Sequence, residues 1–345
     1  MDQKSLGTLN RQLKNPGFTT PTPDFFMTAP SPSLFSHVPP YEGDPILSLM
    51  EAFQADPRGH KVSLSIGVYF DDEGRLPVLG SVRRAETALL QDIGPRPYLP
   101  IEGIADFRSA VQRLLFGAAH EAVASGRIAT LQTLGGSGAL KVGADFLRRY
   151  FPEAGVWVSD PTWDNHRAIF EGAGLEVKTY PYYDPATGGL SFDRMLEGPD
   201  GLPPHSIVLL HASCHNPTGV DLSKAQWESL IPVLRERGLI PFIDIAYQGF
   251  GDGLDEDAFA LRALADAGIP FFAANSFSKN FSMYGERCGG LSVVCVDRAA
   301  AETVLGQLKA TVRRNYSTPP THGARVITRV LQDPALFALW TDETA

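Results

Sequence analysis

The chain has 345 residues, of which 43% are hydrophobic and 20% are charged, as expected for a soluble globular protein of one or two domains. Its formal net charge of −9 argues against a nucleic acid or an anionic membrane as partner, and no apolar run approaches the roughly 20 residues that a membrane span requires. The three cysteines are odd in number and lack a Cys-x-x-Cys spacing, so we expect a reducing, cytoplasmic setting and no metal site.

The first part of the chain has little periodic pattern. Residues 1–33 are rich in Pro, Ser, Thr and Asn, and we expect a disordered tail or an extension. Translation could start at Met27, or the segment could be a flexible arm of the protein. Within residues 34–76 the pattern predicts a helix over 46–55 and a short strand over 62–68.

From residue 77 onward the chain becomes more regular. A helix is predicted over 81–90, opened by a serine cap at Ser81, and an amphipathic helix over 106–116. Between them, the three prolines of residues 95–100 predict a rigid loop, in which Tyr98 could face solvent or a partner.

After residue 127, apolar strands alternate with helices. Strands are predicted over 128–133, 155–159, 176–182, 207–211, 240–245, 271–275 and 290–295. Helices are predicted over 138–150, 163–173, 224–237, 257–267 and 299–313. This alternation indicates an α/β fold with a mostly parallel sheet sandwiched by helices, and ligands in such sheets lie beyond the carboxyl ends of the strands.

Lys279 follows one of these buried strands. Burial lowers the pKa of an ammonium group and frees the amine as a nucleophile. Ser276 and Ser278 before it and Arg287 after it could hold a phosphate, and a reactive amine beside a phosphate is what a pyridoxal phosphate enzyme needs. A surface lysine in a serine-rich loop fits this stretch equally well.

Other polar clusters also follow strands. The glycine-rich residues 135–138 could bind a phosphate at a helix N-terminus, although a plain tight turn explains them too. Trp163 could stack on a cofactor ring or cap the core, and His166 alone is more typical of a structural histidine. Asn216 lies in a turn sequence and could hydrogen-bond a ligand oxygen.

Asp244 ends an apolar run, and a buried carboxylate needs a cation. A protonated pyridine nitrogen is one such cation and a local arginine is another, with Tyr247 close by in either case. Arg313 and Arg314 near a helix C-terminus favour the helix dipole, or they could clamp the carboxylate of an acidic substrate.

Together these residues resemble the class I aminotransferases, the aspartate and aromatic aminotransferase group of pyridoxal phosphate enzymes with fold type I. The resemblance runs from about residue 39 to the C-terminus and is closest to the bacterial aromatic-amino-acid (tyrosine) aminotransferase branch. The stretches that carry it are residues 98–103, 136–140, 159–163, 215–219, 244–250, 276–279 and 285–287.

The resemblance implies a role for each matched residue. Lys279 would hold pyridoxal phosphate as a Schiff base and shuttle a proton, Asp244 would pair with the pyridine nitrogen, and His166 would support Asp244. Tyr247 and Asn216 would hydrogen-bond the phenolic oxygen and lower the pKa of the lysine linkage, while Trp163 would stack on the ring and, with Asn216, also meet the substrate. The expected phosphate-binding residues are Ser137, Gly138, Ala139, Ser276, Ser278, Arg287 and, from the neighbouring subunit of a homodimer, Tyr98.

The expected activity is transfer of the amino group from tyrosine, phenylalanine and, by the same resemblance, aspartate to 2-oxoglutarate. Arg313 of the neighbouring subunit would bind the side-chain carboxylate of a dicarboxylic substrate, and Gly67 would lie over the substrate. Specificity for aspartate alone is the alternative within the same class.

The resemblance also implies a domain plan. Residues 34–76 would form an N-terminal arm and part of a small domain, residues 77–333 the large cofactor-binding domain, and residues 334–345 the start of an inter-domain helix. The family binds the substrate α-carboxylate with a further arginine late in the small domain, and no residue of this sequence matches it. We therefore also consider a truncated fragment that binds the cofactor without full turnover.

Overall fold

The computed structural model describes residues 34–40, 45–63, 67–71, 73–91 and 93–344. The chain divides into two compact units, residues 1–67 and 68–345. The expectations for residues 1–33, including a start at Met27, lie outside the described residues. No helix in the described ranges is long and apolar enough to cross a membrane.

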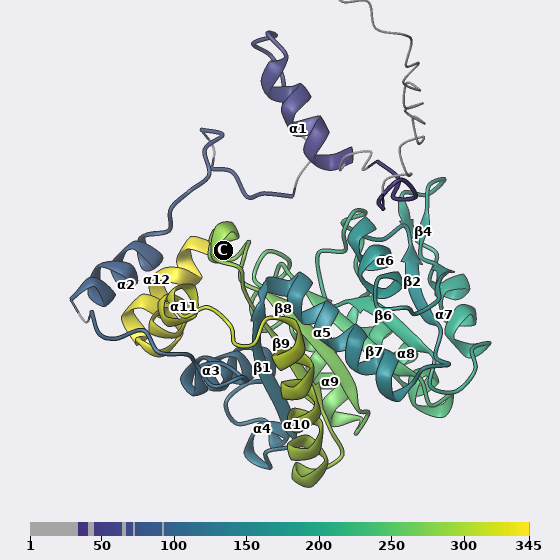
Figure 1. The fold of residues 1–345 in the computed structure, drawn as a ribbon. Coiled ribbons are helices and arrows are strands. Elements are labelled where there is room, and N and C mark those ends of the chain that lie inside the picture. The colour runs from purple at the N-terminus through teal and green to yellow at the C-terminus, as the bar shows by residue number, and fades with distance from the viewer. Residues whose placement is uncertain (1–33, 41–44, 64–66, 72, 92, 345) are drawn as a thin grey trace, which may run out of the picture. The chain divides into compact units, whose positions relative to one another are not determined.

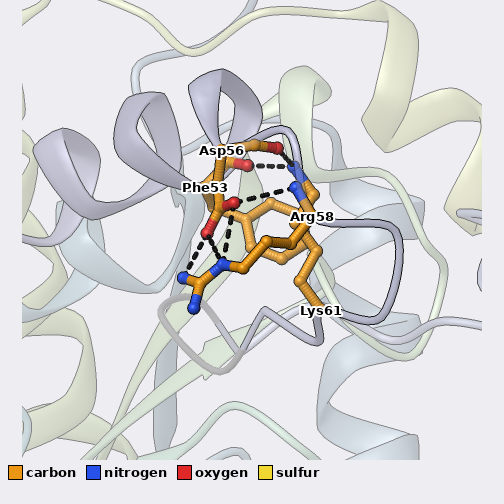
Figure 2. A network of polar contacts seen from close by, with 4 residues as sticks. All are labelled: Phe53, Asp56, Arg58 and Lys61. Atoms are coloured by element: carbon orange, nitrogen blue, oxygen red, sulfur yellow. Dashed lines mark hydrogen bonds and ion pairs between the residues drawn. The ribbon is translucent and has the colours of Figure 1, made fainter.

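The first unit contains helix α1 (Pro45–Ala55), close to the helix predicted over 46–55. A polar network closes its C-terminal end (Figure 2): the Lys61 ammonium donates to the carbonyls of Phe53 and Asp56 and lies 4.5 Å from the centroid of the Phe53 ring. A cation there satisfies carbonyls that have no partner within the helix. The guanidinium of Arg58 pairs with the Asp56 carboxylate in the same network and lowers the pKa of that carboxyl group.

The strand predicted over 62–68 is wrong for residues 62, 63, 67 and 68, which belong to no strand, and the residues between them lie outside the described part. A strand needs a hydrogen-bonded neighbour, and none of the described strands pairs with this segment.

A seven-stranded mixed sheet forms the centre of the second unit (Figure 1), with the strand order β1-β9-β8-β7-β6-β2-β3. All adjacent pairs are parallel except those of β9, which runs antiparallel to both β1 and β8. The strands are β1 (Ile128–Leu134), β2 (Val156–Asp160), β3 (Val177–Pro181), β6 (Ile207–His211), β7 (Ile240–Ile245), β8 (Phe271–Ser276) and β9 (Cys288–Val294). The predicted α/β class with a mostly parallel sheet is confirmed.

Successive residues of the central strands bury their side chains in two separate cores, one on each face of the sheet. In β6, Ile207 and Leu209 join one core, whereas Val208 and Leu210 join the other. Side chains alternate between faces along a strand, so a strand that is apolar at every position requires helices on both sides.

Two groups of helices supply those covers. The core that contains Ile207 is completed by α5 (Gly135–Tyr150), α6 (Asp164–Glu171) and α10 (Arg298–Asn315). The opposite core takes side chains from α2 (Gly80–Leu90), α3 (Ala105–Phe116), α4 (Glu121–Ala124), α7 (Phe192–Asp200), α8 (Lys224–Glu236), α9 (Phe259–Asp266), α11 (His322–Gln332) and α12 (Pro334–Thr344). Helix α7 was missed in the sequence because Gly198 and Pro199 normally interrupt a helix. A separate two-stranded ribbon joins β4 (Tyr183–Asp184) to β5 (Gly189–Leu190).

The parallel strands β2, β6, β7 and β8 all end at one edge of the sheet, because parallel neighbours run in the same direction. The register pairs His211 with Asp244 and Ile245 with Asn275 across these ends. Polar residues that are distant in the sequence therefore meet at this edge.

The serine cap predicted for the helix at 81–90 is wrong. Helix α2 begins at Gly80, its N-cap residue Leu79 supplies no side-chain hydrogen bond, and Ser81 lies inside the helix. The carboxylate of Glu343 in α12 takes the place of the cap: it accepts hydrogen bonds from the backbone N–H groups of Gly80 and Ser81 and from the Ser81 hydroxyl at 2.6 Å. An acceptor 262 residues away in the sequence gives no local signal.

This contact predicts that Glu343→Ala lowers the free energy of unfolding by about 1 kcal/mol, the usual cost of losing a helix cap. Urea unfolding followed by circular dichroism measures the difference. Glu302→Ala, which removes an exposed carboxylate from α10, is the matched control and leaves the stability within about 0.5 kcal/mol of the parent protein. Equal losses in both variants would contradict the capping role of Glu343.

Candidate active site

Lys279 lies just beyond the end of β8, held in place by the fully buried Phe277, which packs edge-on against the ring of Phe107. Its Nζ lies 4.9 Å from the centroid of the Tyr247 ring. Burial lowers the pKa of Lys279, and the positive charge of Arg287 lowers it further, while Asp244 opposes the shift. The site therefore raises the fraction of amine that is neutral and nucleophilic at a given pH.

Asp244 near the end of β7 is a buried carboxylate with a histidine partner. Its Oδ2 lies 2.9 Å from Nε2 of the fully buried His166, and Nδ1 of His166 lies 2.8 Å from the Thr162 hydroxyl. Both nitrogens of the ring are engaged, so His166 is fixed in orientation and Asp244 keeps a hydrogen-bonded neighbour. The local arginine considered as a partner for Asp244 forms no ion pair with it among the described residues.

A second histidine lies beside this pair. His211 at the end of β6 has its ring centroid 5.1 Å from that of His166, and its buried Nδ1 has no hydrogen-bond partner among the described residues. One ligand atom each from His166, His211 and Asp244 lie within 4.8 Å of one another, a grouping that could hold a metal ion. Because both nitrogens of His166 are in hydrogen bonds, the geometry suits a hydrogen-bonded network better than a metal centre.

An anion pocket lies at the start of α5. The helix begins at Gly135, three residues earlier than predicted, and no acidic residue or side-chain cap occupies its first turn. Ser137, Gly138 and Ala139 thus lie in the first two turns of a helix whose N-terminal amides and dipole attract negative charge. Gly135 has a φ of +67°, and a Cβ there would come within 2.7 Å of Nη2 of Arg287, so only glycine allows this approach.

Arg287 brings a fixed positive charge to the same pocket. Its Nη1 donates to the Tyr284 carbonyl at 2.8 Å and to the Ser278 hydroxyl at 3.3 Å, while the Ser276 hydroxyl accepts from the backbone N–H of Ser278 at 3.2 Å. Arg287 itself has a φ of +53°, a left-handed conformation that directs the chain back into β9. A guanidinium, two hydroxyls and backbone amides are the kinds of donor that bind a phosphate.

Trp163 and Tyr247 complete this part of the site. Trp163 precedes α6, is partly buried and meets the His166 ring edge-on with centroids 5.2 Å apart. The pKa of Tyr247 is raised, first by burial and then by the negative charge of Asp244. Asn216 lies in the turn after β6, partly exposed, and neighbouring Cys214 is close enough to Tyr247 to act on its pKa.

Three other expected site residues are not joined to this cluster. Tyr98 is 90% exposed, and Arg313 near the end of α10 donates to the Ser317 hydroxyl at 2.8 Å. Within the described ranges no hydrogen bond or ion pair links either residue to Lys279. Gly67 belongs to the first unit, and its place over a substrate stays a prediction.

The sequence interpretation assigned no role to two histidines beside Asp244: His211, the last residue of β6, and His215 in the turn after it. His215 is 2% exposed, its Nε2 lies 2.8 Å from the Ser159 hydroxyl, and its pKa is lowered to about 4 by burial and by His166. Burial also lowers the pKa of His211 well below its usual value. The strand-end position of His211 was visible in the sequence, but its alignment with Asp244 required the sheet order.

Comparison with known families agrees with the site. The family model described as "Aminotransferase class I and II" matches residues 59–345. The chain belongs to this family. This family member is 61% identical to the tyrosine aminotransferase of Klebsiella pneumoniae and 54% identical to the aspartate aminotransferase of Pseudomonas aeruginosa, in each case over 90% of this chain and 78% of the relative.

A solved structure gives the same result. The aromatic-amino-acid aminotransferase of Burkholderia pseudomallei, described as covalently bound to pyridoxal phosphate, superposes with a TM-score of 0.89 at 52% identity. The match covers 90% of this chain and 78% of that one. At this similarity the aminotransferase fold extends over nearly all of the described chain.

The lowered pKa values of His211 and His215 predict that this aminotransferase loses stability as the pH falls below about 6.5. Below this pH the histidines of the unfolded chain bind protons, whereas the buried rings of the folded chain stay neutral. The free energy of unfolding therefore declines from pH 6.5 down to the pKa of the folded state. For His215 alone the loss is about 2 kcal/mol between pH 6.5 and 5.

Thermal unfolding at pH 7 and at pH 5, followed by circular dichroism, tests this. His215→Gln should lose less stability over that interval than the parent protein, and His60→Gln, which removes an exposed histidine, should keep the parent dependence. If all three proteins lost equal stability, the buried neutral state of His215 would be refuted.

Proposed function

We propose that this chain catalyses transfer of the amino group from aromatic amino acids to 2-oxoglutarate, with pyridoxal phosphate attached to Lys279. The observation that carries the proposal is a desolvated lysine amine between the buried Asp244–His166 pair and the anion pocket of Arg287. The relatives named tyrosine and aromatic-amino-acid aminotransferase support the choice of substrate. Bound pyridoxal phosphate supplies an electron sink for chemistry at the substrate α-carbon.

The anion pocket would hold the phosphate end of the cofactor. Arg287 offers a charged, directional donor, Ser276 and Ser278 offer hydroxyls, and the first turn of α5 offers backbone amides. The amides would come from the turn that carries Ser137, Gly138 and Ala139. Since Gly135 lets Arg287 approach the helix, charge and helix dipole act on the same anion.

At the opposite end of the site, Asp244 would pair with the protonated pyridine nitrogen. A carboxylate with only 6% exposure is costly without a cation, and His166 already holds one of its oxygens. His166 is in turn held by Thr162, so the carboxylate is oriented before any ligand arrives.

Lys279 would act as the nucleophile and carry a proton to and from the substrate α-carbon. Its lowered pKa keeps more of the amine neutral near pH 7, which suits both roles. Tyr247 beneath Nζ and Asn216 beyond β6 would hydrogen-bond the phenolic oxygen, and Trp163 would stack on the ring.

We further propose a cytoplasmic homodimer with shared sites. Tyr98 and the segment after Arg313 border the same hollow of about 320 Å³, lined by Arg96, Pro97, Tyr98, Leu99, Thr318, Pro319 and Thr321. This hollow contains none of the residues around Lys279, as expected if it completes the site of a second copy. All three cysteines are free, which suits a reducing compartment.

A second candidate is an aminotransferase specific for aspartate. The 54% identical relative from Pseudomonas aeruginosa carries that name, and the expected roles of the residues around Lys279 do not separate the two substrates. Arg313 is the residue expected to separate the two functions, because only a dicarboxylic substrate has a side-chain carboxylate for it to bind.

The central claim predicts a lysine-dependent absorption band in the visible region after pyridoxal phosphate is added. Lys279→Ala should abolish this band and lower transamination at least about a hundredfold, since it removes both the attachment point and the proton carrier. Lys141→Ala on α5 is the control and retains the band. A band that survives in Lys279→Ala would refute the assignment.

The substrate assignment predicts a selective effect of Arg313→Leu. Its kcat/KM for aspartate should fall about a hundredfold or more, because a charge-assisted contact is lost, while kcat/KM for phenylalanine changes little. Arg314→Leu, one residue along α10, is the matched control and spares both substrates. Equal losses for aspartate and phenylalanine would sink the role of Arg313, and negligible phenylalanine activity in the parent protein would favour the aspartate-specific function.

A further inference from the structure

Behind the Asn216 turn lies a buried chain of hydrogen bonds centred on His215. The two ring nitrogens are engaged on opposite sides: Nε2 lies 2.8 Å from the hydroxyl of Ser159 in β2, and Nδ1 lies 2.8 Å from the hydroxyl of Thr218. Beyond Ser159 the chain continues to Tyr180 in β3, whose hydroxyl interacts with Ser159 and donates to the Leu209 carbonyl of β6 at 2.8 Å. The chain therefore ties the turn to three adjacent strands of the sheet.

The Leu209 end of this chain fixes its direction. The Thr218 hydroxyl accepts from the backbone N–H of Val220 at 3.2 Å and can still either donate to Nδ1 of His215 or accept from it. At the other end the carbonyl of Leu209 can only accept. Tyr180 donates its proton to this carbonyl, and Ser159 therefore donates to Tyr180. Nε2 of His215 must then donate to Ser159, and Nδ1 of the neutral ring accepts from Thr218.

The position of the ring itself is also determined. The His215 imidazole stacks on the Tyr182 ring with centroids 4.0 Å apart and planes 13° apart, and the Tyr182 hydroxyl donates to the Val220 carbonyl at 2.6 Å. Tyr182 thus holds both His215 and the far end of the turn. A neutral ring suits this stack, because a buried imidazolium would have no carboxylate partner among the contacts described for it.

The backbone on both sides of Asn216 is held by the same unit. The Asp221 carboxylate accepts from the backbone N–H groups of Cys214 at 2.6 Å and His215 at 2.8 Å, and the His215 carbonyl accepts from Gly219 at 2.7 Å. Within the described part of the chain the Asn216 side chain forms no hydrogen bond, so its orientation depends on the backbone that His215 and Asp221 fix.

We propose that His215 is a positioning residue for Asn216: its neutral imidazole, in the Nε2–H form, clamps the turn so that the Asn216 amide is held ready for the phenolic oxygen of the cofactor. The inference rests on the proposed function, because it assigns Asn216 that partner. His215 itself touches neither substrate nor cofactor in this scheme. It acts by limiting the orientations that Asn216 samples, which lowers the entropy cost of its hydrogen bond.

A double-mutant cycle tests the proposal in the cofactor-loaded protein, with the spectroscopic pKa of the lysine–cofactor linkage and the Kd for pyridoxal phosphate as readouts. Asn216→Ala should raise the spectroscopic pKa by about one unit, and His215→Gln should raise it by part of that amount. The double variant should show no larger shift than Asn216→Ala alone, because His215 acts only through Asn216. Additive shifts would overturn the proposal.

Two further variants separate positioning from loss of fold. Ser159→Ala removes a single link of the chain and should shift the spectroscopic pKa in the same direction as His215→Gln, by less. His120→Gln removes a hydrogen-bonded histidine next to α4, before the start of β1, and should lower the melting temperature without moving the spectroscopic pKa. If the spectroscopic pKa tracked the melting temperature in all these variants, the proposal would be wrong.

The outcome also distinguishes this inference from the proposed function. Loss of the lysine-dependent band only in Lys279→Ala supports the function, whereas an unchanged pKa in His215→Gln refutes the positioning role and leaves the function standing. In the cofactor-free protein, nitrogen NMR at pH 7 should show His215 neutral with its proton on Nε2. A proton on Nδ1 would contradict the direction derived for the chain.

Discussion

The structure depends on how a buried carboxylate at the end of β7 is stabilised. Asp244 is 6% exposed, and such a group is stable only with a cation or strong hydrogen bonds. His166 supplies a hydrogen-bond contact to its Oδ2 at 2.9 Å. The fold places this buried carboxylate close enough to Lys279 to raise the pKa of the amine against the effect of burial.

The sheet topology explains why the required groups meet. The parallel strands β2, β6, β7 and β8 end at one edge, where residues more than 100 positions apart meet, from Ser159 in β2 to Lys279 after β8. Two opposite charges act on Lys279 in this site: Asp244 raises its pKa, whereas Arg287, which lies against the first turn of α5, lowers it. A dipolar ligand with a cationic ring nitrogen and an anionic phosphate matches that arrangement.

Much of the sheet could be predicted because burial on both faces forces long apolar runs, and these were found near their observed bounds. Helix α7 was not predicted because Gly198 and Pro199 are residues that normally interrupt a helix. The cap of α2 was predicted wrongly because its acceptor, Glu343, is remote in the sequence. The strand expected over 62–68 failed because β propensity cannot supply a pairing partner.

The sequence alone determined the residue types of the site, since a lysine, an aspartate and an arginine at strand ends already limit the chemistry. Only the tertiary structure decided how they act together. The lowered pKa of Lys279 and the engagement of both nitrogens of His166 follow from burial and from neighbours on other strands. The same holds for the chain through His215, which joins β2, β3 and β6. Desolvation and hydrogen-bond direction depend on these three-dimensional neighbours, and no local pattern encodes them.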